Sequence, residues 1–193
     1  MNPVSVVLIV VAAIVLLLLL WAVTQYNRLV RLRNLVQEAW RQIDVELHRR
    51  HDLIPNLVET VKGYAAHERA VFDEVARARA AASGTAAGPA QQAQQENALT
   101  AALGRLFAVA ENYPQLKADE TFKQLQNRIT ALEESIADRR EFYNDQVNLN
   151  NIRVKVFPDV MIAQRFGFQP AQLLNFTADE KRDVDMDALF SGT

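Results

Sequence analysis

An uncharged apolar stretch near the start of the chain decides how the remaining residues can be arranged. Residues 4–23 read VSVVLIVVAAIVLLLLLWAV. Twenty helical residues measure about 30 Å, which is the thickness of the hydrocarbon core of a bilayer. No Lys or Arg precedes the stretch and no small-residue cleavage site follows it, so an uncleaved anchor is favoured over a signal peptide. A buried soluble helix would have to enclose residues 16–20 on every side. We therefore expect residues 1–25 to form a transmembrane anchor.

The residues that flank this stretch predict its orientation. Trp21 and Tyr26 stand where interfacial aromatic residues are found at the edge of a membrane. Three cations then precede the first acidic residue: Arg28, Arg31 and Arg33. Because positively charged flanks stay on the cytoplasmic side, we expect a single-pass protein with its N-terminus outside and its bulk in the cytoplasm. The same cations could also bind anionic headgroups.

Composition limits the class of protein that follows the anchor. The chain has 193 residues, a formal net charge of −2, 6 Gly and 6 Pro, and no Cys. A net negative charge argues against a broad surface for nucleic acid. The absence of Cys excludes disulfides, a cysteine nucleophile and thiolate metal sites. The low Gly and Pro content argues against a turn-rich β protein.

Helical periodicity dominates the rest of the sequence. Spacings of three and four give one apolar stripe on the first helix: Leu29, Leu32, Val36, Trp40, Ile43 and Leu47. Similar stripes predict helices over 56–82, 89–113 and 119–157, with Asp119 as an N-cap, and a short helix over 158–166 before Gly167. We expect an all-α fold: an anchor continuing into an up-and-down four-helix bundle over residues 26–157. Residues 158–176 form a membrane-proximal segment and residues 177–193 an acidic tail.

Pro55 leaves two arrangements open. The first helix may run on through Pro55 with a kink, since Ile54, Val58 and Val61 stay in phase with the stripe. Alternatively the chain turns at residues 52–55 and a second helix begins at Asn56, which has capping-box spacing to Glu59. We favour the turn, because it gives helices of comparable length.

Several unusual residue combinations resemble the LemA family. They stand at 26–30 (YNRLV), 38–40 (EAW), 43–45 (IDV), 49–58 (RRHDLIPNLV), 59–65 (ETVKGYA), 67–68 (HE), 110–117 (AENYPQLK), 142–144 (FYN), 157–158 (FP) and 167–168 (GF). The resemblance covers about residues 4–176. It implies a bacterial inner-membrane protein with one N-terminal span, a helical domain and no established catalytic activity. Magnetosome-associated relatives within the family suggest a role in membrane organisation.

The candidate catalytic residues are few. His48 and His51 lie one turn apart and could share a metal, but no carboxylate pattern accompanies them, and solvated histidines are the simpler interpretation. His67 and Glu68 are adjacent and do not have zincin spacing. No phosphate-binding loop or nucleophile elbow is present. We expect no enzyme, no catalytic residue, no metal and no cofactor.

Polar residues interrupt two of the apolar stripes. If the first hairpin folds about Leu53, one charged layer crosses the middle of the bundle: Glu38, Arg41, Glu68 and Arg140. Buried charges are tolerated when they are paired, and they can fix the register of helices. The alternative is that these side chains reach solvent at the edge of the bundle.

The segment 157–168 should lie near the membrane if the fourth helix returns toward it. Five apolar residues could pack on the bundle, contact lipid or meet a neighbour: Phe157, Met161, Ile162, Phe166 and Phe168. The leading hypothesis is a membrane-anchored scaffold that self-associates and contacts the bilayer and unidentified protein partners, with no nucleic acid. The second hypothesis is a membrane-shaping or lipid-contacting protein acting through residues 157–168. A cryptic metal-dependent enzyme comes third.

Overall fold

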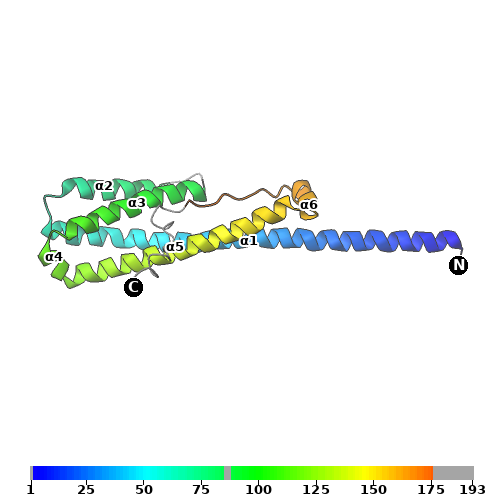
Figure 1. Cartoon of the computed structure of the whole chain (residues 1–193), viewed down its shortest axis with the longest axis horizontal. Helices are drawn as coiled ribbons and strands as arrows, with labels where there is room; N and C mark the ends of the chain where they lie inside the picture. The colour runs from blue at the N-terminus through cyan, green and yellow to red at the C-terminus, as the bar shows by residue number, and fades with distance from the viewer. Residues whose placement is uncertain (1, 85–87, 176–193) are drawn as a thin grey trace, which may run out of the picture. The chain divides into compact units, whose positions relative to one another are not determined.

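The computed structural model describes residues 2–84 and 88–175, and its regular secondary structure there is entirely helical (Figure 1). The six helices are α1 (Pro3–Tyr64), α2 (Arg69–Ala82), α3 (Pro89–Ala110), α4 (Pro114–Ala118), α5 (Glu120–Lys155) and α6 (Asp159–Phe166). The predicted all-α class and the long apolar N-terminal helix are confirmed. The predicted acidic tail of residues 177–193 lies outside the described residues.

Two compact units divide the described chain. Unit 1 contains residues 2–39 and 142–172, and unit 2 contains residues 40–141 and 173–175 without the gap at 85–87. Long helices α1 and α5 each contribute residues to both units. Each unit has its own buried side chains and is described separately.

The turn favoured at residues 52–55 is wrong, because α1 continues through Pro55 to Tyr64. Proline has no N–H, so the carbonyl of His51, four residues earlier, loses its helical donor. Arg79 on α2 replaces this donor, with its Nε 3.2 Å from the carbonyl oxygen of His51. Beyond Pro55 the stripe stays buried, with Leu57 and Val61 at 0 % exposure, and this burial favours the continuous helix. The chain turns instead at residues 65–68.

The core of unit 2 is shared by segments from five helices. It contains Ile54, Leu57 and Val61 from α1, Phe72 and Val75 from α2, Leu99, Leu103 and Leu106 from α3, Leu116 from α4, and Phe122 and Ile129 from α5. Ile54 and Val61 belong to the apolar stripe named in the sequence analysis, so the helical periodicity identified the buried face of α1 in this unit. The regular up-and-down order of a four-helix bundle stays a prediction.

The start of α5 is capped as the sequence predicts. Asp119 accepts a hydrogen bond from the backbone N–H of Phe122 through Oδ1 at 2.9 Å, which satisfies a free donor of the first turn. The hydroxyl of Tyr64 donates to Oδ2 at 2.8 Å and ties the end of α1 to this cap. Both bonds favour the ionised carboxylate. They lower the pKa of Asp119, the Phe122 bond having the larger effect.

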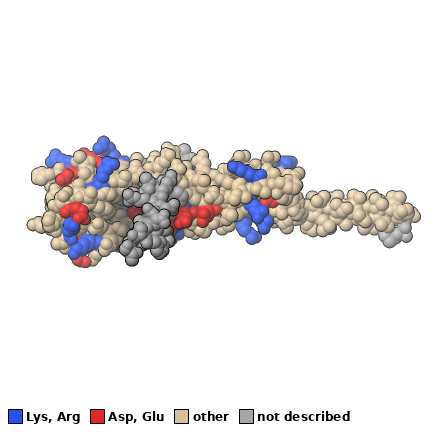
Figure 2. Space-filling view, in the orientation of Figure 1, with Lys and Arg blue, Asp and Glu red and all other residues tan. Residues whose placement is uncertain are grey.

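Unit 1 contains the apolar end of α1, the last part of α5 and helix α6. The 18-residue window of highest hydropathy in α1 has no buried residue, and its length and composition suit a membrane span. The visible face of this stretch carries no charged side chain (Figure 2). After this stretch in the sequence, Leu29 of α1 packs with Val154 of α5 and Ala163 of α6. Gly167 ends α6 as predicted, with a left-handed φ of 72° that favours glycine.

The bond to the His51 carbonyl predicts energetic coupling between Pro55 and Arg79. Arg79→Ala should destabilise the protein by about 1–3 kcal/mol, because a charged donor is lost and the carbonyl has no other helical donor. In the background of Pro55→Ala, the restored N–H of residue 55 can bond that carbonyl, so the effect should shrink by about 1 kcal/mol. A double-mutant cycle of unfolding free energies in detergent measures the coupling. Arg77→Ala, which removes a cation on the same helix, should give no coupling with Pro55→Ala.

The Asp119 cap predicts a specific loss of stability in acid. Its folded pKa lies below the ordinary value of 3.8, so the contribution is fully present above pH 3.8 and disappears as the pH falls through the folded pKa. Asp119→Asn keeps an oxygen acceptor for Phe122 but does not titrate, and should flatten the acid limb of a plot of melting temperature against pH. Asp138→Asn, which changes an exposed residue in the middle of α5, should leave that limb unchanged. Equal acid limbs for wild type and Asp119→Asn would contradict this assignment.

Candidate functional site

A fully buried arginine organises the polar interior of unit 2. Arg50 of α1 has 0 % exposure and forms ion pairs with Glu96 of α3 and Glu133 of α5. Its Nη1 also donates to Oγ1 of Thr100 at 2.8 Å. Thr100 in turn donates to the second oxygen of Glu133 at 3.2 Å. One guanidinium therefore joins three helices through charge-assisted hydrogen bonds.

The sequence contains a signal for this arginine, although the predicted polar layer does not include it. Arg50 stands three residues after Leu47 and four before Ile54, and both of these residues are buried in the apolar stripe. A charged residue at such a position must be paired across the core. The sequence could have identified Arg50, but not its partners, because Glu96 and Glu133 are distant in the chain.

A second ion pair network lies near the first. Glu46 of α1 is 5 % exposed and pairs with Arg49 and with Arg139 of α5, each at 3.2 Å. Arg139 also donates to Oε1 of Gln42 at 3.1 Å. The network joins α1 to α5 about one turn away from Arg50.

The structure separates Glu68 from Arg41, two residues of the predicted polar layer. Glu68 lies in the turn before α2 and accepts a hydrogen bond from the Tyr113 hydroxyl at 3.3 Å. Arg41 stands 23 residues before the end of α1, about 35 Å from that end at 1.5 Å per residue. The proposed grouping of Glu68 with Arg41 is wrong, because the hairpin folds after Tyr64 and not about Leu53.

The other two members of the layer have different surroundings. Arg140 is 3 % exposed, and its Nη1 donates to Oδ1 of Asn97 on α3 at 2.8 Å. Glu38 is exposed. A charged interior therefore exists, but Arg50, Glu96 and Glu133 form its centre.

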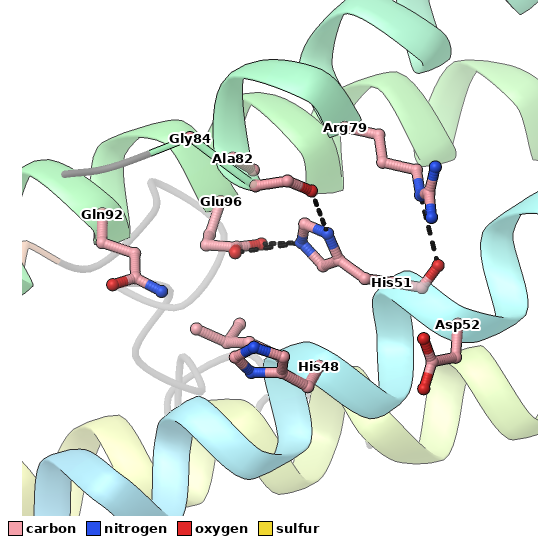
Figure 3. A pocket seen from close by; sticks show the side chains of 10 residues that line it. His48, His51, Asp52, Arg79, Ala82, Gly84, Gln92 and Glu96 are labelled. Atoms are coloured by element: carbon pink, nitrogen blue, oxygen red, sulfur yellow. Dashed lines mark hydrogen bonds and ion pairs between the residues drawn. The ribbon is translucent and has the colours of Figure 1, made fainter.

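A pocket of about 370 Å³ opens beside this network (Figure 3). His51 crosses its wall, with Nδ1 2.9 Å from Oγ of Ser83 and Nε2 3.0 Å from Oε1 of Glu96. The neutral tautomer with the proton on Nε2 satisfies both contacts, because it donates to Glu96 and accepts from Ser83. His48 lies on the same wall, and its Nδ1–H donates to the Asp44 carbonyl at 2.8 Å. This bond, with the nearby Asp44 charge, raises the pKa of His48.

The contacts of Ser83, His51 and Glu96 have the order found in serine hydrolases, in which a base lies between a nucleophile and a carboxylate. The neighbouring backbone donors do not complete such a site. The N–H of Ser83 donates to the Arg79 carbonyl at 2.9 Å, and that of Gly84 to the Ala81 carbonyl at 3.1 Å. Neither is available as an oxyanion-hole donor. The arrangement supports a structural clamp that attaches the end of α2 to α1 and α3.

His48 and His51, which the sequence analysis weighed as a metal pair and set aside, are not placed as metal ligands. Nδ1 of His48 bonds a backbone carbonyl, and both ring nitrogens of His51 contact other side chains. Over residues 2–84 and 88–175, no group of three His, Cys, Asp or Glu side chains is arranged to hold a metal ion.

In unit 1, α6 is attached to the residues that follow the apolar stretch. With its amide oriented to satisfy both contacts, Gln25 donates to Oδ1 of Asp159 at 3.0 Å and accepts from Nε1 of Trp21 at 3.3 Å. Asp159 is 3 % exposed and also accepts from Arg153 of α5 at 3.2 Å. Tyr26 contacts the ring of Phe166 edge-on at 4.9 Å between centroids.

The five predicted contact residues of this segment divide into two groups. Ile162 and Phe168 are half-buried against the cluster of Leu29, and the Arg33 guanidinium lies over the Phe168 ring at 5.5 Å. The other three are exposed: Phe157 at 74 %, Met161 at 61 % and Phe166 at 59 %. Asp159 and Gln25, which attach the segment, were missed because nothing in their local sequence indicates burial or pairing.

The fold and these sites define a class of all-α protein with one apolar N-terminal helix, a helical unit with ion pairs in its interior, and an aromatic segment beside the end of the apolar stretch. A sequence model of the LemA family matches residues 39–187, which is more than half of the chain. The chain belongs to the LemA family, and the resemblance found in the sequence is confirmed.

Curated relatives are found among proteins of magnetic bacteria and mycoplasmas. The chain is 25 % identical to magnetosome protein MamQ 2 of Paramagnetospirillum magneticum, over 89 % of this chain and 72 % of that protein. It is 23 % identical to magnetosome protein MamQ of Magnetospirillum gryphiswaldense, over 87 % and 71 % respectively. It is also 23 % identical to Protein LemA of Metamycoplasma hominis, over 86 % and 76 %.

The buried guanidinium predicts a large effect of removing one charge. Arg50→Met should destabilise the protein by about 3–5 kcal/mol, because Glu96 is left in the core without its cation. The measurement is the free energy of unfolding of the full-length protein in detergent. Arg105→Met serves as the control, since Arg105 pairs with Glu74 on the surface and should contribute less than about 1 kcal/mol. Similar effects of the two variants would contradict the assigned role of Arg50.

Proposed function

We propose that this protein is a non-catalytic scaffold of the bacterial inner membrane, anchored by residues 1–25 and self-associating through its helical part. Its partners are then the bilayer, further copies of the chain and other proteins. The apolar end of α1 and the membership of a membrane-associated family support the anchor. The two relatives named as magnetosome proteins support a role at a membrane.

Self-association is supported mainly by an unpaired apolar stripe on the last part of α5. Leu149 and Ile152 of α5, and Val156 directly after its last residue, are 50 %, 55 % and 50 % exposed. Their spacing of three and four places them on one face, since the N–H of Val156 still bonds the Ile152 carbonyl at 3.0 Å. Phe142, one heptad before Leu149, is 47 % exposed on the same face. An exposed stripe of this period is typical of a seam between helices of different copies.

Anchoring in one membrane would favour this seam. Copies held by the same bilayer have the same orientation and present residues 149–156 at the same height. A parallel contact can then form without a large loss of orientational freedom. Asp145 lies between Phe142 and Leu149, so the uninterrupted apolar part of the stripe is residues 149–156.

The proposal also includes the orientation of the chain in the membrane. Arg28, Arg31 and Arg33 would lie on the cytoplasmic side and carry residues 26–193 with them. Because the natural chain has no Cys, a single introduced thiol reports on sidedness. A thiol at residue 130, in unit 2, should react with an impermeant maleimide only after the cells are opened.

The proposal predicts a discrete assembly in mild detergent. Mass photometry of the full-length protein should give a multiple of the 21.7 kDa chain after subtraction of the detergent. Leu149→Gln with Ile152→Gln should shift the protein to smaller species, because the seam loses its apolar contacts. Val45→Gln with Leu173→Gln replaces two exposed apolar residues elsewhere and should leave the mass unchanged. A wild-type monomer would overturn self-association.

A further inference from the structure

We propose that α6 and the cations beside it bind anionic phospholipid headgroups of the membrane that α1 crosses. The face consists of Phe157, Met161 and Phe166 with Arg28, Arg31, Lys155 and Arg165, and we call it the headgroup face. This inference deepens the proposed function by naming the partner of the aromatic segment. It depends on the anchor but not on self-association.

The first observation that supports this proposal is the position of α6 along α1. Trp21 and Gln25 are linked to Asp159 at the start of α6, and Tyr26 contacts Phe166 at its end. Both ends of α6 are therefore held beside the short stretch 21–26 of α1. The uncharged run ends at Val23, so this stretch is where a spanning helix leaves the hydrocarbon core. Within unit 1, α6 lies at the depth of the lipid headgroups.

The second observation is that large apolar side chains of this segment are exposed. Phe157, Met161 and Phe166 are each more than half exposed, although Ile162 of the same segment packs inward. In water, three large apolar groups on a ten-residue segment would be unfavourable. At the membrane interface the same groups can enter the boundary between headgroups and acyl chains, as the apolar face of an interfacial helix does.

The third observation concerns the cations beside α6. Arg28, Arg31, Lys155 and Arg165 are exposed, and none of them forms an ion pair within the part of the chain that the structure describes. The one buried carboxylate nearby, Asp159, is already occupied by Arg153. Figure 2 shows basic side chains gathered beside the uncharged stretch of α1.

Phosphate fits these cations. Arginine can hold two phosphate oxygens with its planar fork, and each cation near an anionic leaflet adds favourable free energy. An acidic protein partner would suit the charges, but it would not explain why large apolar side chains accompany them at headgroup depth. A bilayer surface satisfies both the charges and the exposed rings.

The experiment places a fluorescent label on α6 of the full-length protein in nanodiscs. Because the chain has no Cys, Met161→Cys gives one labelling site at the centre of the headgroup face. Brominated lipids should quench this label, and quenching should increase when phosphatidylglycerol replaces part of the phosphatidylcholine. A label at Leu17→Cys, in the span, serves as the positive control, and one at Thr130→Cys, in unit 2, as the aqueous control.

Two variants then separate the contributions. In the labelled protein, Phe166→Asp should reduce quenching in both lipid mixtures, because the inserted ring is lost. Lys155→Gln with Arg165→Gln should reduce the increase caused by phosphatidylglycerol, with the equilibrium constant for lipid contact of α6 falling about fivefold for each cation removed. This pair leaves Arg28 and Arg31 in place, so the orientation of the span is kept. Lys123→Gln with Arg128→Gln makes the same charge change in unit 2 and should have no effect.

The outcomes distinguish this inference from the scaffold. Quenching at residue 161 equal to that at residue 130 would overturn it, whatever the mass of the assembly. Quenching without dependence on phosphatidylglycerol would overturn the anionic headgroup as ligand. A monomeric protein with strong, phosphatidylglycerol-dependent quenching would support the headgroup face and reject self-association.

Discussion

The buried guanidinium of Arg50 is the constraint on which the interior of unit 2 depends. A cation with no solvent contact is tolerated only where carboxylates meet it, and here they come from α3 and α5. Such a pair adds little net stability over an apolar core, but it strongly disfavours any sliding of the helices that would leave a charge unpaired. One side chain therefore joins three helices, and the pocket beside His51 lies next to this network.

Pro55 has an unexpected role in the same unit. The imide breaks one hydrogen bond of α1 but does not end the helix, because the surrounding stripe is fully buried. The freed carbonyl of His51 becomes an acceptor for Arg79, while the His51 ring contacts Ser83 and Glu96. A residue that normally breaks helices thus provides an attachment point for α2. The pocket lies where these contacts meet, which explains its polar wall.

Unit 1 differs in its packing from unit 2, whose interior is polar. Its buried contacts are few and hold one short helix beside the end of the apolar stretch. Most of the large side chains of α6 and of the neighbouring end of α5 remain exposed, together with unpaired cations. In the functions proposed for this protein, this surface contacts lipid on one face and a second copy of the chain on another. The anchor would supply both partners at high local concentration.

The sequence by itself determined the helical class, the apolar span, most of the buried stripes, the Asp119 cap and the family. These features are local, because periodicity, capping chemistry and run length act over a few residues. The tertiary structure decided the fate of Pro55, the partners of Arg50 and the separation of Glu68 from Arg41. Each depends on groups far apart in the chain: the burial beyond Pro55 outweighs the lost hydrogen bond, and the position of the hairpin decides which charges can meet.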